Sequence, residues 1–413
     1  MPVFKPFRGI TPYGEYIKSF PTRPLSNYTH EEIAKKAERE FSYVRMVEPY
    51  LSGEPQNLEQ NLGRVRANYE ELLRNHNLHQ EEESGYYLYC QVLPDGSVFR
   101  GLLGLVSVED YNSGKIKKHE ETLTHRKEKL SKYLEGVNLQ AEPVLLTYSS
   151  NAELEALMSE EERKNPVLEY ADSKGTKHRV WKIQDEETLK KYEQILAKVE
   201  AFYIADGHHR MGSTALYSER RKDKNPNHTG NEPYNFVYSF IVSDQSIKIN
   251  DFNKVVKDLN GLTVEQFLHQ LEDKFIIENK GENPYYPEQK HFISLYLDGQ
   301  FYKLTLKEEC CCEECLGIID HYLLDKYILS PILGIDDLKT TKRVDYLRGS
   351  SCVEGITKLK EKVDNEEYRV AFGVHPVSFS DLVEIADKNL KMPPKCTYIE
   401  PKLVTALVMY DMK

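Results

Sequence analysis

The chain has 413 residues, of which 40% are hydrophobic and 29% are charged, and its formal net charge is -11. This length and composition are typical of a globular protein with room for two domains and a sizeable core. An acidic chain is poorly suited to neutralising a long phosphate backbone, so we expect no nucleic-acid partner, although a local basic pocket for a small phosphate compound is compatible with it.

Helical and strand patterns alternate through the first half of the chain. Two helical stretches come first, then two or three strands joined at a Pro-Gly turn, LPDG. A charged helix, two strands, another helix and the strand AFYIA follow. The expected ranges are helices over 29–40, 57–76, 119–136 and 189–200, and strands within 85–111 and at 141–149, 178–183 and 201–205. The last strand enters the turn DGHHR, after which a helix with small residues begins.

The second half predicts further strands and helices. A strand lies near Ile247, a helix covers 263–275, and residues 291–307 form a hairpin that turns at Asp298-Gly299. Helices follow over 318–329, and a proline-rich loop leads to an apolar strand at the end. We expect an α+β fold with domains over 1–245 and 246–413, a soft boundary between them, and one site that the two halves share.

The cysteines and the absence of an apolar segment indicate a cytoplasmic protein. No run approaches the roughly 18 apolar residues of a membrane span, and the first residues lack the apolar core of a secretory signal. Seven cysteines, four of them within ECCCEEC, are a poor basis for disulfides, and no second ligand pair stands at zinc spacing. We therefore expect no membrane partner and a reduced, structural segment. The cysteines are Cys90, Cys310, Cys311, Cys312, Cys315, Cys352 and Cys396.

The turn DGHHR concentrates hydrogen-bonding groups at a helix start. Asp206 ends a strand, Gly207 permits a close turn, and His208, His209 and Arg210 open the helix. Helix-start amides attract phosphate, and an arginine can bind it through two hydrogen bonds. A carboxylate beside a phosphate fits Mg²⁺. Ser213 and Thr214, one turn on, are expected to assist. The alternatives are that Asp206 only caps the helix and the histidines lie on the surface, or, less favoured, a zinc site.

A second group of charges is KIKKHEETLTHR, residues 115–126. We place Glu120 at the start of a helix, between a basic cluster and Arg126. Its residues alone leave two roles open: an electrostatically favoured helix cap, or a general base beside the phosphate turn.

The order HEE…R, PVLL and ADGHHR resembles the ParB/sulfiredoxin-like nucleotide-binding superfamily, and in particular its free L-serine kinases. A longer resemblance covers nearly the whole chain and extends to a large family that shares this turn and often ends in M-P-P-K-S-T-x-F-x-P-K. It rests on GLLGLVSVEDYNSGKIKKHEET, ADGHHR, PYNFVYSFIV, FNKVVKDLNGLT, ILGIDD, AFGVHPVS and IADKNLKMPPKCTYIEPKL. This chain has Cys396 in place of the serine of that ending.

The resemblance implies an L-serine kinase that makes O-phospho-L-serine, most similar to the pyrophosphate-dependent members. It gives Glu120 the role of base, and it assigns Mg²⁺ and phosphate binding to Asp206, His208, His209 and Arg210. Lys395, Thr397 and Lys402 would reach the phosphates, or else form a rigid loop with surface lysines. Further candidates for donor or serine binding are His119, Lys117, Lys118, Arg126 and Arg343, the last with a surface ion pair as its alternative.

Neither a G-x-x-x-x-G-K-[ST] loop nor a kinase-type glycine loop occurs in the sequence, which is compatible with pyrophosphate as donor. Three alternatives stay open at this point. They are an ATP- or ADP-dependent serine kinase, a phosphoserine phosphatase, and a nucleotide-gated, ParB-like DNA-binding module, which the negative charge disfavours.

Overall fold

A computed structural model describes residues 1–310, 315–349 and 353–413. The fold is α+β, and the chain forms two compact units. Unit 1 contains residues 1–118, 122–247 and 401–413, and unit 2 contains residues 119–121 and 248–400. This division differs from the expected domains in two segments: the last 13 residues return to unit 1, and residues 119–121 belong to unit 2.

Unit 1 is built on a mixed sheet that, among the described residues, has nine strands. Their order is β6-β11-β8-β12-β5-β4-β10-β9, and β1 also pairs with β5. The pairs β11–β6 and β12–β8 are parallel and the others antiparallel. The strands are β1 (Phe4–Lys5), β4 (Tyr86–Val92), β5 (Val98–Ser107), β6 (Ile116–Lys117), β8 (Val144–Tyr148), β9 (Leu168–Ala171), β10 (Lys177–Ile183), β11 (Phe202–Asp206) and β12 (Phe236–Ser243).

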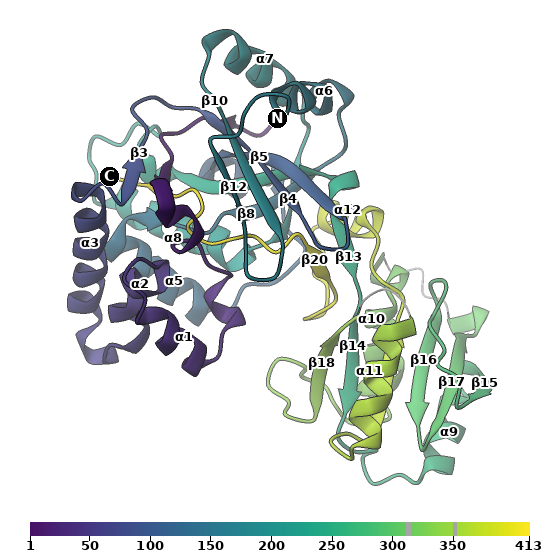
Figure 1. The fold of residues 1–413 in the computed structure, drawn as a ribbon. Coiled ribbons are helices and arrows are strands. Elements are labelled where there is room, and N and C mark those ends of the chain that lie inside the picture. The colour runs from purple at the N-terminus through teal and green to yellow at the C-terminus, as the bar shows by residue number, and fades with distance from the viewer. Residues whose placement is uncertain (311–314, 350–352) are drawn as a thin grey trace. The chain divides into compact units, whose positions relative to one another are not determined.

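Helices cover this sheet because its central strands are apolar on both faces. Every residue of β8 and β12 is buried, as in strands with a packed layer on each side. Figure 1 shows α6 and α7 on one side of these strands and α2, α3 and α5 on the other. The helices of unit 1 are α1 (His30–Ala37), α2 (Tyr43–Ser52), α3 (Leu58–Arg74), α4 (Val108–Asn112), α5 (Thr124–Val137), α6 (Ala152–Glu161), α7 (Glu186–Leu196) and α8 (His208–Asp223).

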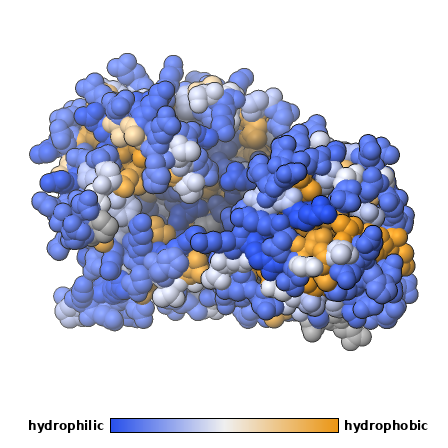
Figure 2. All heavy atoms as spheres, turned by 90° about the horizontal axis from the view of Figure 1, so that it is seen from below, coloured by the Kyte–Doolittle hydropathy of each residue, from blue (hydrophilic) through white to orange (hydrophobic). Residues whose placement is uncertain are grey.

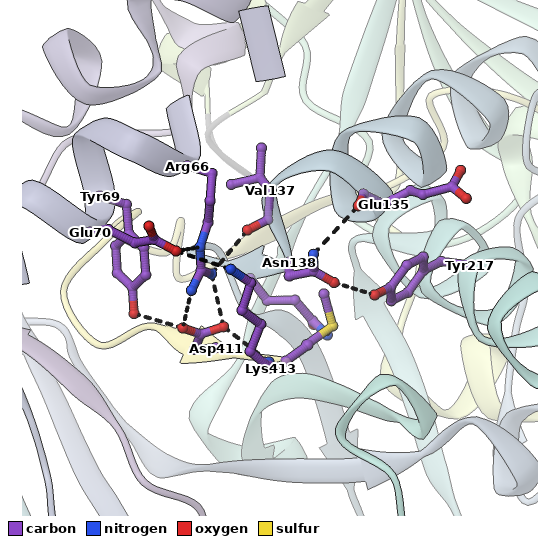
Figure 3. A network of polar contacts seen from close by, with 11 residues as sticks. Arg66, Tyr69, Glu70, Glu135, Val137, Asn138, Tyr217, Asp411 and Lys413 are labelled. Atoms are coloured by element: carbon purple, nitrogen blue, oxygen red, sulfur yellow. Dashed lines mark hydrogen bonds and ion pairs between the residues drawn. The ribbon is translucent and has the colours of Figure 1, made fainter. Parts of the chain in front are cut away.

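A polar network fixes the last residues of the chain to unit 1 (Figure 3). Two guanidinium nitrogens of Arg66 each donate to a carboxylate oxygen of Asp411 at 3.0 Å, and the Tyr69 hydroxyl donates to the same carboxylate at 3.0 Å. The side chains of Arg66 and Asp411 are only 12% and 10% exposed. Nearby, β21 (Tyr410–Asp411) pairs with β7 (Leu139–Gln140), and β2 (Ile10–Pro12) pairs with β3 (Leu78–Gln80). The terminal segment is therefore part of the packing of unit 1.

Unit 2 contains an antiparallel sheet in the order β15-β17-β16-β19-β14-β18. Its strands are β14 (Phe252–Val256), β15 (Phe275–Gly281), β16 (Phe292–Leu297), β17 (Gln300–Leu306), β18 (Val344–Arg348) and β19 (Val370–Val374). The helices are α9 (Val264–Leu271), α10 (Asp320–Leu324), which continues into a π-helical turn, α11 (Val353–Asp364) and α12 (Phe379–Asp387). A separate pair joins β13 (Lys248–Asn250) to β20 (Tyr398–Glu400).

Most expected elements are present, and the hairpin at Asp298-Gly299 has both residues at positive φ (53° and 79°), as a two-residue turn requires. The helix expected over 119–136 begins only at Thr124, so the placement of Glu120 at a helix start is wrong. The apolar strand expected at the end is reduced to the two residues of β21. The sequence reading also missed α2, α6, β9, β15, β18, α11, β19 and α12, and α4 (Val108–Asn112) lies at the end of the range expected to hold only strands.

The surface seen in Figure 2 is mostly hydrophilic, with a broad apolar patch toward the right of that view and smaller apolar areas elsewhere. No helix in the described ranges is long and apolar enough to cross a membrane. Cys90, Cys310 and Cys396 are free thiols. Cys311, Cys312 and Cys352 lie outside the described residues, so the expectation for the ECCCEEC segment stays a prediction.

Candidate active site

The turn DGHHR connects β11 to α8. Asp206 is the last residue of β11, and Gly207 is the N-cap of α8 with a φ of 97°. The cap makes no side-chain hydrogen bond, so the alternative in which Asp206 caps the helix is wrong. A Cβ at residue 207 would lie 2.7 Å from Nη2 of Arg210, whose guanidinium folds back over the turn. The positive φ therefore favours glycine, and a larger residue would also make the Arg210 guanidinium shift away from the turn.

Arg210 lies between two carboxylates. It forms ion pairs with Glu142 and, at 3.4 Å, with Asp206. Glu142 accepts a hydrogen bond from the Thr405 hydroxyl at 3.4 Å, and the ammonium of Lys402 lies 3.9 Å from Asp206. We call these five residues the turn network. Lys402 and Thr405 belong to the last segment of the chain, so its anchoring in unit 1 brings two polar side chains to the turn.

The guanidinium of Arg210 is poorly solvated. Its side chain is 22% exposed, and burial lowers its pKa to about 10. It is still charged at neutral pH, and its two carboxylate partners balance that charge. An incoming phosphate would compete with Glu142 and Asp206 for this cation.

The start of α5 adds basic residues beside the turn. The backbone N–H of Leu123, the N-cap of α5, donates to Nε2 of His209 at 3.1 Å. Burial lowers the pKa of His209, and the charges of Arg126, His125 and Lys127 lower it further. His209 is therefore neutral near pH 7, with Nε2 as an acceptor. Lys127 also packs against α8 one turn after its start, since its Cδ lies 3.0 Å from the position that a Cβ on Gly212 would take.

Two neighbouring helices thus begin with basic side chains. Neither α5 nor α8 has an acidic residue in its first turn, whereas within the described residues every other α-helix except α2 has one. Basic groups at a helix N-terminus oppose the macrodipole, at a cost of roughly 0.3–1 kcal/mol each. An anion bound between the two helix starts would reverse this cost.

The local charge also differs from that of the whole chain. Four cations meet two carboxylates here, which gives a local charge of +2 in a chain of -11. The cations are Arg126, Lys127, Arg210 and Lys402, and the carboxylates are Asp206 and Glu142. A small phosphate compound is the ligand that such a patch favours.

Three residues of the predicted set differ from expectation. Ser213 is fully buried and its hydroxyl donates to the carbonyl of His209 at 2.5 Å, so the expected phosphate contact is not supported. Thr214 bonds in the same way to Arg210, at 3.0 Å. Arg343 in unit 2 donates through Nε to Asp258 at 3.0 Å, so it has the ion pair that we weighed as its alternative. His208, another residue predicted to bind phosphate, is buried, with only 4% of its surface exposed.

Glu120 belongs to unit 2 and lies near the MPPKC loop. The N–H of Met392 donates to the carbonyl of His119 at 2.9 Å, and Glu121 pairs with Lys339 at 2.7 Å. Burial raises the pKa of the Cys396 thiol, and the charge of Glu120 raises it further. Unit 2 therefore brings together parts of two separate segments of the resemblance, HEE (residues 119–121) and MPPKC.

Cys396 has a structural role in this loop. It is 3% exposed, and its Sγ donates to the carbonyl of Pro393 at 3.0 Å. A serine hydroxyl at this position has the same capacity to donate to that carbonyl. Lys395 is exposed, with φ 58°, and its ammonium lies 5.4 Å from the centre of the Phe252 ring. The phosphate roles of Lys395 and Thr397 stay predictions.

The basic cluster before Glu120 is divided between two units. Lys117 is in β6, opposite Tyr203 of β11, and Lys118 lies over the Tyr111 ring at 5.0 Å. His119 is in unit 2, where burial, and to a smaller extent the charge of Lys391, lowers its pKa to about 3. His119 is therefore a neutral group at physiological pH.

Sequence reasoning missed Lys127, His125, Glu142 and Thr405. The signal for the first two was available, because THRK places three basic residues at a helix start. Glu142 and Thr405 gave no signal, since they reach Arg210 only through tertiary packing. Arg126 was predicted from the sequence as a candidate for donor or serine binding, and it lies close enough for its charge to lower the pKa of His209.

The residues fit a magnesium ion that arrives with a phosphate compound. No group of three or more potential ligand side chains lies together in the described part of the chain, so a cage made by the protein alone is not supported there. Asp206 is 45% exposed and offers a carboxylate beside the proposed phosphate position. Mg²⁺ commonly binds through one or two carboxylates together with substrate phosphates.

The fold is α+β, and the candidate site is a group of basic side chains at the starts of α5 and α8. The sequence pattern of one family matches residues 4–333, about four-fifths of the chain, and the chain belongs to that family, DUF1015, described as a protein of unknown function. No curated protein matches the chain.

Several solved structures are similar at low identity. One is a free serine kinase in complex with AMP (13% identity, 72% of this chain and 87% of that chain covered, TM-score 0.36). Others are a conserved hypothetical protein from Pyrococcus furiosus (13%, 72% and 89%, TM-score 0.34) and C-terminally truncated SbnI from Staphylococcus aureus (13%, 72% and 82%, TM-score 0.35). TM-scores below 0.5 carry no argument on function, which must come from the residues of this chain.

Proposed function

We propose that the chain is a phosphotransferase that moves a phosphoryl group from pyrophosphate to free L-serine, giving O-phospho-L-serine and phosphate. The observation that carries the phosphate part is the pair of adjacent helix starts, α5 and α8, with basic side chains and no acidic residue in either first turn. The acceptor and the donor rest on the resemblance of HEE, ADGHHR and MPPKCTYIEPK to the serine kinases.

Arg210, Lys127, Lys402 and the first amides of α8 bind the donor in this proposal. They balance the negative charge that spreads over the transferring phosphoryl group, which is the main contribution a protein makes to such a reaction. Arg210 exchanges its carboxylate partners for phosphate oxygens, and Glu142 keeps the guanidinium oriented over Gly207 until then.

Glu120 accepts the proton of the serine hydroxyl in this proposal. The serine Oγ forms a bond to the terminal phosphorus, the bond from that phosphorus to the bridging oxygen breaks, and phosphate leaves. Glu120 stands three residues before Leu123, so the covalent chain keeps the Cα atoms of these two residues within about 11 Å of each other. The N–H of Leu123 in turn bonds to His209 of the turn. Mg²⁺, which we propose that Asp206 holds, would add positive charge at the donor phosphates.

The test is a panel of donors and acceptors. Magnesium pyrophosphate, ATP and ADP are each supplied with L-serine, L-threonine or L-homoserine, and the phosphorylated amino acid is measured by mass spectrometry. The nucleotides are included because the free serine kinase structures contain AMP or ADP. We expect phosphoserine with pyrophosphate. Phosphoserine only with a nucleotide would correct the donor, and phosphate release from phosphoserine with no donor would replace the kinase by a phosphatase.

A further inference from the structure

Unit 1 contains a cavity of about 490 Å³ that is separate from the turn network. It is lined by the start of α2 and the end of α3, two helices that pack together in the region shown on one side of the sheet in Figure 1. The lining residues are Glu40, Phe41, Ser42, Arg45, Met46, Asn68, Glu71, Leu72, Asn75 and Asn77. A volume of this size is ample for a small metabolite.

The two helix ends give the cavity both signs of charge. The α2 helix starts here with Arg45 in its first turn and no acidic residue, so the helix dipole and the guanidinium are both positive. The α3 helix ends here with Glu71, and Glu40 adds a second carboxylate. None of these three charged side chains forms an ion pair or a side-chain hydrogen bond within the described residues.

Asn77 provides an independent indication of a ligand. It is only 8% exposed, it lines the cavity, and its side-chain amide has no hydrogen-bond partner in the described part of the chain. The amide atoms are not among the buried atoms without a partner, so solvent reaches them in the cavity, and a bound polar molecule can replace water as their hydrogen-bond partner. Phe41, Met46 and Leu72 form an apolar part of the same lining.

We propose that this cavity binds a free α-amino acid with an apolar side chain. Its carboxylate would pair with Arg45 at the start of α2, and its ammonium would pair with Glu71 at the end of α3. The Asn77 amide would bond to one of these groups, and the side chain would lie against Met46 and Leu72. This site is independent of the phosphotransfer proposed above, because it shares no residue with the turn network.

Calorimetric titration of the full chain with L-methionine tests the proposal. Two analogues each remove one charge: L-methioninamide lacks the carboxylate, and N-acetyl-L-methionine lacks the ammonium. Loss of one charged hydrogen bond should weaken binding at least about tenfold for each analogue. Failure of L-methionine, L-leucine and L-phenylalanine to bind at 10 mM would overturn the proposal.

Charge-removing variants locate the binding. Arg45→Gln should weaken L-methionine binding at least about tenfold, but it should not weaken binding of L-methioninamide, which already lacks the carboxylate. Glu71→Gln should likewise weaken L-methionine binding at least about tenfold, but it should not weaken binding of N-acetyl-L-methionine, which already lacks the ammonium. Arg64→Gln, an exposed position of α3 outside the lining, is the matched control and should bind as the unmodified chain does. Affinities unchanged in both cavity variants would also overturn the proposal, whatever the phosphotransfer assay gives.

Discussion

Replacing Arg210 by glutamine should weaken binding of the phosphoryl donor about 10- to 150-fold. Burial lowers the pKa of this guanidinium from 12.5 to about 10, which corresponds to about 3 kcal/mol against the charged form. A phosphate that bonds to it contributes about 1.5–3 kcal/mol as a charged hydrogen-bond partner. The variant also leaves Glu142 and Asp206 without their shared cation, and two carboxylates near the phosphate position repel an anion.

Calorimetric titration with magnesium pyrophosphate at fixed ionic strength measures this effect. Arg220→Gln is the matched control, because Arg220 is on the same helix and pairs with Glu128 at 2.6 Å. The double variant Arg210→Gln/Glu142→Gln separates two roles of the arginine. If Arg210 only neutralises Glu142, the double variant regains affinity, and that recovery, or an affinity within twofold of the unmodified chain in the single variant, would refute a direct phosphate contact.

Three further predictions concern the base, the terminal network and the neutral histidine. Glu120→Gln should keep donor affinity and lose at least about 100-fold in turnover, and near-normal turnover would exclude it as base. Asp411→Ala should lower the free energy of unfolding by about 3 kcal/mol in urea, because Arg66 loses its two-bond partner, whereas Glu186→Ala on an exposed pair should cost under about 0.5 kcal/mol. The pKa of His209 is lowered in the free protein, and a bound anion should raise it. Pyrophosphate binding should therefore take up a proton, and the affinity should increase as the pH falls from the His209 pKa of the bound protein to that of the free protein. Titrations in buffers of different ionisation enthalpy should show this uptake, and an equal uptake in His209→Asn would assign it to the ligand instead.

The sequence predicted the strand-turn-helix at DGHHR because each part has a strong local cause. The apolar run before Asp206 forms a strand, glycine permits the positive φ, and the helix begins at His208 as expected. The start of α5 was placed too early because HEET has the composition of a helix start. In the structure those residues precede the helix, and its N-cap is Leu123, which no capping pattern indicates.

The partners of the turn could not be predicted because they come from distant segments. Glu142 precedes β8, and Thr405 and Lys402 follow β20. They meet Arg210 and Asp206 because the last residues return to unit 1, where Asp411 bonds to Arg66. Such contacts depend on how the whole unit packs, and a single sequence contains no periodic signal for them.

Phosphoserine formation tests the central claim most directly. The unmodified chain is incubated with L-serine, pyrophosphate and Mg²⁺, and ³¹P NMR follows the phosphorus-containing species. We predict that O-phospho-L-serine and phosphate appear in equal amounts as pyrophosphate disappears, and that Arg210→Gln slows both. Phosphate release without phosphoserine, or no reaction with pyrophosphate, ATP or ADP, would contradict the account.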